Sequence, residues 1–217
     1  MRSGSDRAAF AGVAAALMVS AGSAGADGAS VDPSYGRVQG DIAVVVGAGA
    51  VVAPRGPRAE AELRVRYLES AGIFATLEDA ELVGSPSEPR GALVTGLELR
   101  PLFLFRWLKG HEVQRARFDL ALDSIGLDLG AVFAQPAGTG FASRTGFELG
   151  LGLELPILEQ ASGPWIGVRG GLRWSDGALG HAAAAGADAF QAVLAVTLAW
   201  HQILSVHVVD VGDRPPR

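Results

Sequence analysis

The chain of 217 residues lacks several things that most proteins of its size contain. It has no cysteine, which excludes disulfides, a cysteine metal site and a lipidated N-terminal cysteine. It has no asparagine, and Lys109 is its single lysine, so arginine supplies nearly all the positive charge. The formal net charge is −5, whereas a nucleic-acid-binding protein normally presents a basic face. We therefore expect no nucleic-acid partner.

Long hydrophobic runs are also missing after the N-terminal region. Hydrophobic residues make up 49% of the chain, yet no stretch after residue 30 contains 18 uncharged apolar residues. A transmembrane helix needs about 20 such residues, so we expect none in the mature chain. High hydrophobicity without long runs is typical of membrane strands in which apolar and polar residues alternate.

The first 26 residues are predicted to form a signal peptide. Arg2 and Arg7 give a positively charged start, and residues 8–19 form an apolar stretch too short to span a bilayer. Ala24-Gly25-Ala26 then fits a small-residue cleavage site. We expect export of the chain, cleavage near Ala26, and a polar lead-in over residues 27–36.

The rest of the chain alternates between apolar and polar residues. In residues 146–155, Phe147 and Leu151 belong to an apolar face, while Glu148 and Gly150 belong to the opposite face. Side chains of a strand point alternately to its two faces, so this run predicts one strand. The same pattern predicts eight strands, at about 40–53, 59–68, 73–77, 92–107, 125–134, 142–155, 165–174 and 189–201.

Two places interrupt the alternation. Pro101 falls inside the predicted strand 92–107 and removes a backbone donor, so we expect a bulge or bend there. Large apolar residues occupy even-numbered positions over 118–122 but odd-numbered positions over 125–129. Between residues 108 and 125, Phe118 and Leu122 fit helical spacing. We expect a short amphipathic helix near 115–124.

The prediction is an all-β fold, a closed antiparallel up-and-down barrel of about eight strands over residues 37–204, with a C-terminal extension at 205–217. With its export signal, unequal loops and a last strand closing near Trp200, the chain resembles the small eight-stranded outer-membrane β-barrels of Gram-negative bacteria. The resemblance is architectural, without a diagnostic motif. It implies a transmembrane barrel in the outer membrane, with outer-membrane lipid and the barrel-assembly machinery as partners.

The resemblance has one departure, at the C-terminus. Members of this family usually end on an aromatic residue in the closing strand, whereas 17 residues follow Trp200 here. Residues 202–209 either extend the last strand or lie beyond it.

The direction of the apolar face separates a membrane barrel from a soluble lipocalin-like barrel. The polar face consists mainly of glycine and of seven acids, with Glu78 and Asp128 among them, against six arginines, which suits a narrow interior in which each charge needs a partner. We expect an ion-pair lattice there, made by Glu60, Glu62, Arg64, Arg66, Glu98, Arg100, Arg144, Glu148, Glu154, Arg169 and Arg173. Four tryptophans near predicted strand ends are expected to mark the membrane interfaces: Trp107, Trp165, Trp174 and Trp200.

The sequence offers few residues for chemistry. His201, Ser205 and His207 cluster near the last strand and are the candidates for a Ser-His site acting on lipid. In a strand, however, these three are simply neighbours on one face, so we expect no catalytic site. Scattered histidines without cysteine predict no metal, and Gly47-Ala48-Gly49 lacks the further residues of a phosphate loop. No cofactor is expected.

The predicted function is therefore that of a non-catalytic outer-membrane barrel with an envelope-structural role or a surface-interaction role. Interaction would use the predicted loops near 81–91, 135–141 and 175–188, and the sequence does not identify the surface or periplasmic ligand. Two alternatives stay open at this point: a lipid-modifying outer-membrane enzyme, and a soluble periplasmic lipocalin-like barrel that binds a ligand.

Overall fold

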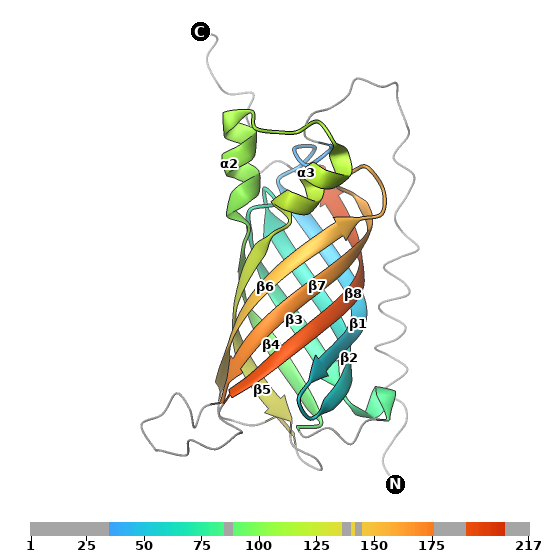
Figure 1. Cartoon of the computed structure of the whole chain (residues 1–217), viewed down its shortest axis with the longest axis vertical. Helices are drawn as coiled ribbons and strands as arrows, with labels where there is room; N and C mark the ends of the chain where they lie inside the picture. The colour runs from blue at the N-terminus through green and yellow to red at the C-terminus, as the bar shows by residue number, and fades with distance from the viewer. Residues whose placement is uncertain (1–34, 85–88, 136–139, 142–144, 176–189, 207–217) are drawn as a thin grey trace. The chain divides into compact units, whose positions relative to one another are not determined.

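The computed structural model describes residues 35–84, 89–135, 140–141, 145–175 and 190–206. Eight antiparallel strands form a closed barrel in which each strand pairs with its neighbours in the chain and β1 pairs with β8 (Figure 1). The predicted fold class is confirmed. The strands are β1 (Ile42–Ala53), β2 (Gly56–Tyr67), β3 (Ala71–Asp79), β4 (Gly91–Leu99), β5 (Gly126–Gln135), β6 (Gly146–Pro156), β7 (Gly163–Trp174) and β8 (Phe190–Leu204).

Several predictions fall outside these residues. The signal peptide and most of the polar lead-in precede residue 35, and most of the C-terminal extension follows residue 206. The last strand is longer than expected, since β8 continues through residue 202 to Leu204, which pairs with Ile42 at the start of β1.

The barrel has two distinct ends. At one end, which we name the cap end, β1 begins, β8 ends, and short turns at residues 68–70 and 157–162 join neighbouring strands. The helices α2 (Pro101–Lys109) and α3 (Ala116–Asp123) connect β4 to β5 at the same end (Figure 1). At the other end, the loop end, a tight turn at residues 54–55 joins β1 to β2. The strands that flank all three predicted interaction loops also meet the loop end.

The helix α2 corrects the sequence-based prediction. A strand was expected to run to residue 107, but β4 stops at Leu99 and α2 starts at Pro101. Proline fits the first turn of a helix because its missing N–H would have no partner there. Gly110, with a left-handed φ of 64°, then ends α2. The helix α3 lies where a helix was predicted.

The wall of the barrel is apolar outside and charged inside. Outward residues such as Ile73, Leu151 and Leu198 are 60%, 60% and 58% exposed. Inward residues of the same sheet, such as Arg64 and Glu78, are 1% exposed. This distribution is the reverse of that in a barrel with an apolar core, so the charged interior is the feature to examine as a functional site.

Candidate functional site

The charges inside the barrel come mainly from β2, and the space for them comes from β1 and β8. The strand β2 contributes Arg58, Glu60, Glu62, Arg64 and Arg66, all buried. The inward residues of β1 and β8 are mostly small or apolar, including Ala43, Val51, Ala195 and Ala199. Long side chains from β2 therefore cross the interior and reach acids and arginines of β4 to β7.

Glycine supplies further room at two of these positions. A Cβ atom on Gly47 would lie 2.7 Å from Oε1 of Glu62 and 2.9 Å from Cβ of Ala199. A Cβ atom on Gly171 would lie 2.9 Å from Cγ2 of Val193. Real Cβ contacts are not so short, so a larger residue at either position would displace its neighbours.

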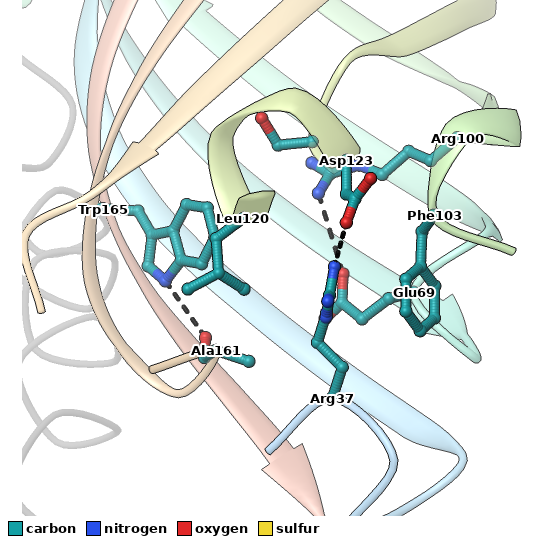
Figure 2. A pocket seen from close by; sticks show the side chains of 9 residues that line it. Arg37, Glu69, Arg100, Phe103, Leu120, Asp123, Ala161 and Trp165 are labelled. Carbon is teal, nitrogen blue, oxygen red and sulfur yellow. Dashed lines mark hydrogen bonds and ion pairs between the residues drawn. The ribbon is translucent and has the colours of Figure 1, made fainter. Parts of the chain in front are cut away.

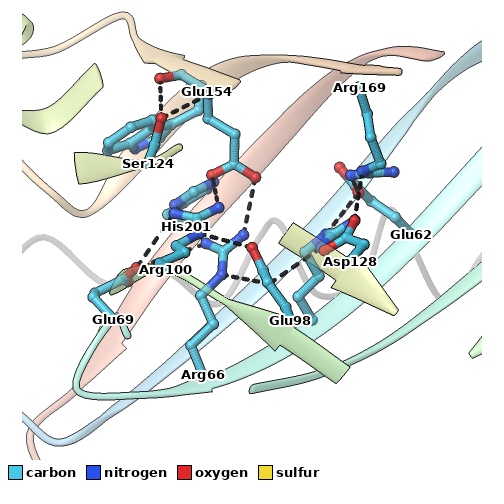
Figure 3. Close-up of polar contacts among 12 residues, drawn as sticks. Glu62, Arg66, Glu69, Glu98, Arg100, Ser124, Asp128, Glu154, Arg169 and His201 are labelled. Carbon is cyan, nitrogen blue, oxygen red and sulfur yellow. Dashed lines mark hydrogen bonds and ion pairs between the residues drawn. The ribbon is translucent and has the colours of Figure 1, made fainter. Parts of the chain in front are cut away.

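The middle of the lattice is built around Arg64, whose partners Glu62, Glu98 and Asp128 are labelled in Figure 3. Its guanidinium binds both carboxylate oxygens of Asp128, at 3.2 and 3.1 Å, and contacts Glu62 at 3.0 Å and Glu98 at 3.1 Å. Arg169 shares two of these partners, because it contacts Glu62 at 2.7 Å and Asp128 at 2.9 Å. Each carboxylate here lies between two arginines, so removal of one arginine leaves several acids without full compensation.

Towards the cap end, four charged side chains form a ring. Glu98 and Glu154 each contact both Arg66 and Arg100, at distances of 2.5 to 3.0 Å. His201 completes this cluster: its Nε2 lies 3.3 Å from Glu154 and its Nδ1 lies 3.5 Å from Arg66. Since a guanidinium can only donate, Nδ1 accepts from Arg66, whereas Nε2 has no hydrogen-bond partner among the described residues.

Towards the loop end, Glu78 holds two arginines. It accepts from Arg58 at 2.9 Å and makes a two-point contact with Arg173, which also binds Glu148. The cavities lined by these lattice residues have room for about a single water molecule. The described interior is thus filled by side chains, as expected of an eight-stranded barrel.

A second network closes the cap end, and Figure 2 shows its pair of Arg37 and Asp123. Arg106 of α2 binds Asp119 and Asp123 of α3, and Arg37, which precedes β1, binds Asp123. Arg37 also stacks over Phe103, with its guanidinium carbon 4.4 Å from the ring centre. Leu120 of α3 packs in an apolar cluster with Ala43, Ala161, Trp165 and Ile203, which seals the barrel beneath the helix. We name the charged part of this end the cap network: Arg37, Arg106, Asp119 and Asp123.

Asp119 is the most heavily bonded residue of the cap network. Its carboxylate accepts from Arg106, from the hydroxyl of Tyr35 at 3.0 Å, and from the N–H groups of Val113 and Arg115. Burial alone would raise the pKa of Asp119, but the Val113 N–H, Arg106 and Tyr35 hold it below its ordinary value. Burial and the hydrogen bond to Asp119 raise the pKa of Tyr35 to about 12.

Ser124, directly after α3, anchors the cap to the wall. The pairing of β6 with β5 ends at Gly152, so the backbone of Glu154 has no partner from β5. The Oγ of Ser124 accepts from the Glu154 N–H at 2.8 Å and lies 2.7 Å from the Glu154 carbonyl oxygen. One hydroxyl thereby replaces a missing strand contact.

The structure places the predicted lattice residues as follows. Ten of the eleven line the interior, and Arg144 lies outside the described residues. Nine of the ten take part in the contacts above, and Glu60 contacts Arg169 at 3.2 Å. Glu78 and Asp128, which the predicted polar face includes, also join the lattice. Two charged partners were not predicted: Arg58, and Glu69, which lies 3.7 Å from both Arg66 and Arg100. Arg58 precedes the expected start of its strand, and a strand start one residue earlier would have included it. The cap network was not predicted, although the spacing of Asp119 and Asp123 puts both on one face of a helix.

The candidate catalytic residues are not brought together within the described part of the chain. His201 points into the barrel and is 1% exposed, where it stacks on Trp165 with ring centres 4.5 Å apart. Ser205 follows the end of β8 and is exposed, and His207 lies outside the described residues. The described residues contain no group of three or more metal-ligating side chains and no helix long and apolar enough to cross a membrane.

The four tryptophans fall into different environments. Trp174 lies on the outer wall near the loop end and packs against Phe147 and Phe190, with ring centres 5.8 and 5.6 Å apart. Trp200 shares the outward parity of β8, and Trp107 lies on α2 and is 42% exposed. Trp165 departs from the expected interface position. Its side chain points inward and is 4% exposed, and its indole N–H donates to the carbonyl of Ala161. The ring fills space in the apolar cluster beneath α3.

The fold and this site define a closed eight-stranded β-barrel protein with a charged, side-chain-filled interior and a helical cap. No model of a known protein family matches the chain, and no curated protein is significantly similar to it. The function must therefore be argued from the barrel itself.

Proposed function

We propose that the chain is an outer-membrane β-barrel that acts without catalysis, in envelope structure or in surface interaction. The observation that carries the proposal is the inverted wall: large apolar residues outside, and a paired charge lattice inside. In water such an outer surface is unfavourable, because apolar patches beyond a few hundred Å² mark sites of interaction with membranes or partners. In lipid it is the expected surface of a transmembrane barrel.

The strand lengths support the same proposal. The strands contain 9 to 15 residues, and about 9 to 11 tilted residues span the hydrocarbon core of a bilayer. The aromatic cluster of Phe147, Trp174 and Phe190 lies on the outer wall near the loop end, where an interface belt would be. A closed barrel also leaves no unpaired edge in the membrane.

The interior argues for a role other than general transport or ligand storage. A lipocalin-like barrel would hold its ligand in an apolar cavity, but here the interior is charged and its cavities are water-sized. The interaction surface of the proposed function is consequently the loop end, where β3, β5 and β7 end.

Fractionation of cells that express the full chain at native level tests this proposal. We expect the mature chain to start near Asp27 and to be recovered with outer membranes after carbonate extraction. Recovery in the soluble periplasmic fraction would reject the proposal. An activity on lipid extracts that is lost in Ser205→Ala and His207→Ala would instead favour the lipid-modifying enzyme.

A further inference from the structure

The helix α2 has an apolar face that no described part of the chain covers. Phe103 and Arg106 point towards α3 and are buried, and the ion pairs of Arg106 with α3 fix the rotation of the helix. The opposite side then presents Pro101, Leu104, Phe105 and Leu108, of which Phe105 and Leu108 are 61% and 73% exposed. Leu108 is the most exposed large hydrophobic residue among those described.

This face continues the outer wall. Only Arg100 separates the end of β4 from α2, and its side chain is held inside the barrel by Glu98 and Glu154. The last outward residues of β4, Leu97 and Leu99, are 56% and 43% exposed, and Leu97 pairs with the outward Ile73 of β3. Figure 1 shows α2 at the rim of the barrel, beside the opening that α3 covers. The apolar surface proposed to meet lipid thus extends without a break from the strands to α2.

The residues around α2 match the chemistry of a lipid interface. Trp107 is 42% exposed, and the exposed Lys109, Arg115 and Arg117 lie on or after the helix at the same end. Tryptophan and basic side chains are enriched where a membrane protein passes from hydrocarbon to headgroups. Nine residues span only about 14 Å, less than half the hydrocarbon core, so α2 is suited to lie at the interface rather than to cross.

We propose that α2 is an interfacial anchor: its apolar face inserts among the acyl chains of the leaflet at the cap end, and the basic residues beside it bind anionic lipid headgroups. This inference rests on the proposed function, because it needs the barrel to be in a membrane. It adds a second contact with lipid, made by a helix and located on one side of the barrel only. Since α2 is bonded to α3 through Arg106, lipid contact would also hold the cap over the barrel end.

The experiment uses the full chain in nanodiscs of phosphatidylethanolamine and phosphatidylglycerol, with an environment-sensitive fluorophore on a single introduced cysteine. Because the native chain has no cysteine, each label is unique. The positions are Leu108→Cys on α2, Leu151→Cys on the wall, and Gln114→Cys as the exposed control in the α2–α3 connection. Lipids brominated at shallow or deep acyl positions quench the fluorophore only where it contacts them.

We expect shallow bromines to quench the label at 108 at least twice as strongly as the label at 114, and deep bromines to quench the label at 151. Quenching at 151 without quenching at 108 would reject the anchor and leave the barrel proposal intact. Absence of quenching at 151 would reject the barrel proposal itself. If the label at 108 is shielded only at high protein concentration and without bromine contact, a second copy covers α2, which also rejects the anchor.

The charge component is tested in the same nanodiscs. With phosphatidylglycerol replaced by phosphatidylcholine, we expect shallower insertion of the label at 108. The substitutions Lys109→Gln and Arg115→Gln together should reproduce that change in anionic nanodiscs. Equal quenching in both lipid mixtures would show that the basic residues do not bind anionic headgroups.

Discussion

The barrel interior and the cap end are both stabilised by arginine–carboxylate networks, but they are built differently. Inside the barrel, ion pairs join strands distant in sequence, such as Arg66 to Glu154 and Arg64 to Asp128, within a closed wall. In the cap network, Arg106 links the two helices through Asp119 and Asp123, and Arg37 reaches Asp123 from the segment before β1, so none of these contacts joins two strands of the wall. The comparison indicates that the lattice is part of the barrel's global stability, whereas the cap can open locally.

The largest expected effect is the loss of a lattice arginine. Arg64→Met leaves Glu62, Glu98 and Asp128 inside the barrel without their shared partner, so we expect destabilisation by about 3–5 kcal/mol. Urea unfolding in lipid vesicles measures this change. The control Arg90→Met removes a half-exposed pair with Glu81 and should cost about 0–1 kcal/mol. Equal small effects of both substitutions would mean that bulk water reaches the lattice.

A smaller and local effect is expected in the cap network. Asp119→Asn weakens the contacts with Arg106, Tyr35 and two backbone N–H groups, which we expect to cost about 1–3 kcal/mol. Amide hydrogen exchange should become faster in residues 101–124, while exchange in the strands should stay slow. The matched control is Glu159→Gln, an exposed carboxylate at the same end. Faster exchange throughout the strands would show that cap and barrel form one cooperative unit.

The smallest effect is spectroscopic and concerns pH. The pKa of Tyr35 is raised to about 12, so its neutral form is favoured in the folded chain. Its contribution to stability is complete below the ordinary tyrosine value of about 10 and is lost as the pH rises from there to about 12. The difference in tyrosinate absorbance between the native chain and Tyr35→Phe gives the titration. In Asp119→Asn the pKa of Tyr35 should move towards its ordinary value. An unchanged pKa would show that Asp119 does not raise the pKa of Tyr35.

The sequence predicts the barrel well because its signal is local. The alternation of apolar and polar residues over 146–155 is enough to predict a strand, because side chains of a strand point alternately to its two faces. The charged residues that fall on the polar face of each strand are then predicted to share the barrel interior. Sequence alone does not predict which carboxylate meets which arginine, since contacts such as Arg173 with Glu78 depend on strand order and register.

The cap was harder to predict because its signals conflict. Pro101 was interpreted as a bulge within a strand, although proline is equally suited to the first turn of a helix. Trp165 was expected at a membrane interface, but its side chain points into the barrel and packs in the apolar cluster beneath α3. Both errors concern the cap end, where packing between elements rather than alternation decides the position of each residue.

The central claim is that the apolar outer wall meets lipid, and Leu151 in the middle of β6 tests it most directly. Single-cysteine variants at Leu151 and at the exposed Glu159 are treated in native membranes with a lipid-soluble thiol reagent and with a charged, water-soluble one. We expect the cysteine at 151 to react only with the lipid-soluble reagent, and the cysteine at 159 to react with both. Rapid reaction of the cysteine at 151 with the charged reagent would contradict the account and place the wall in water.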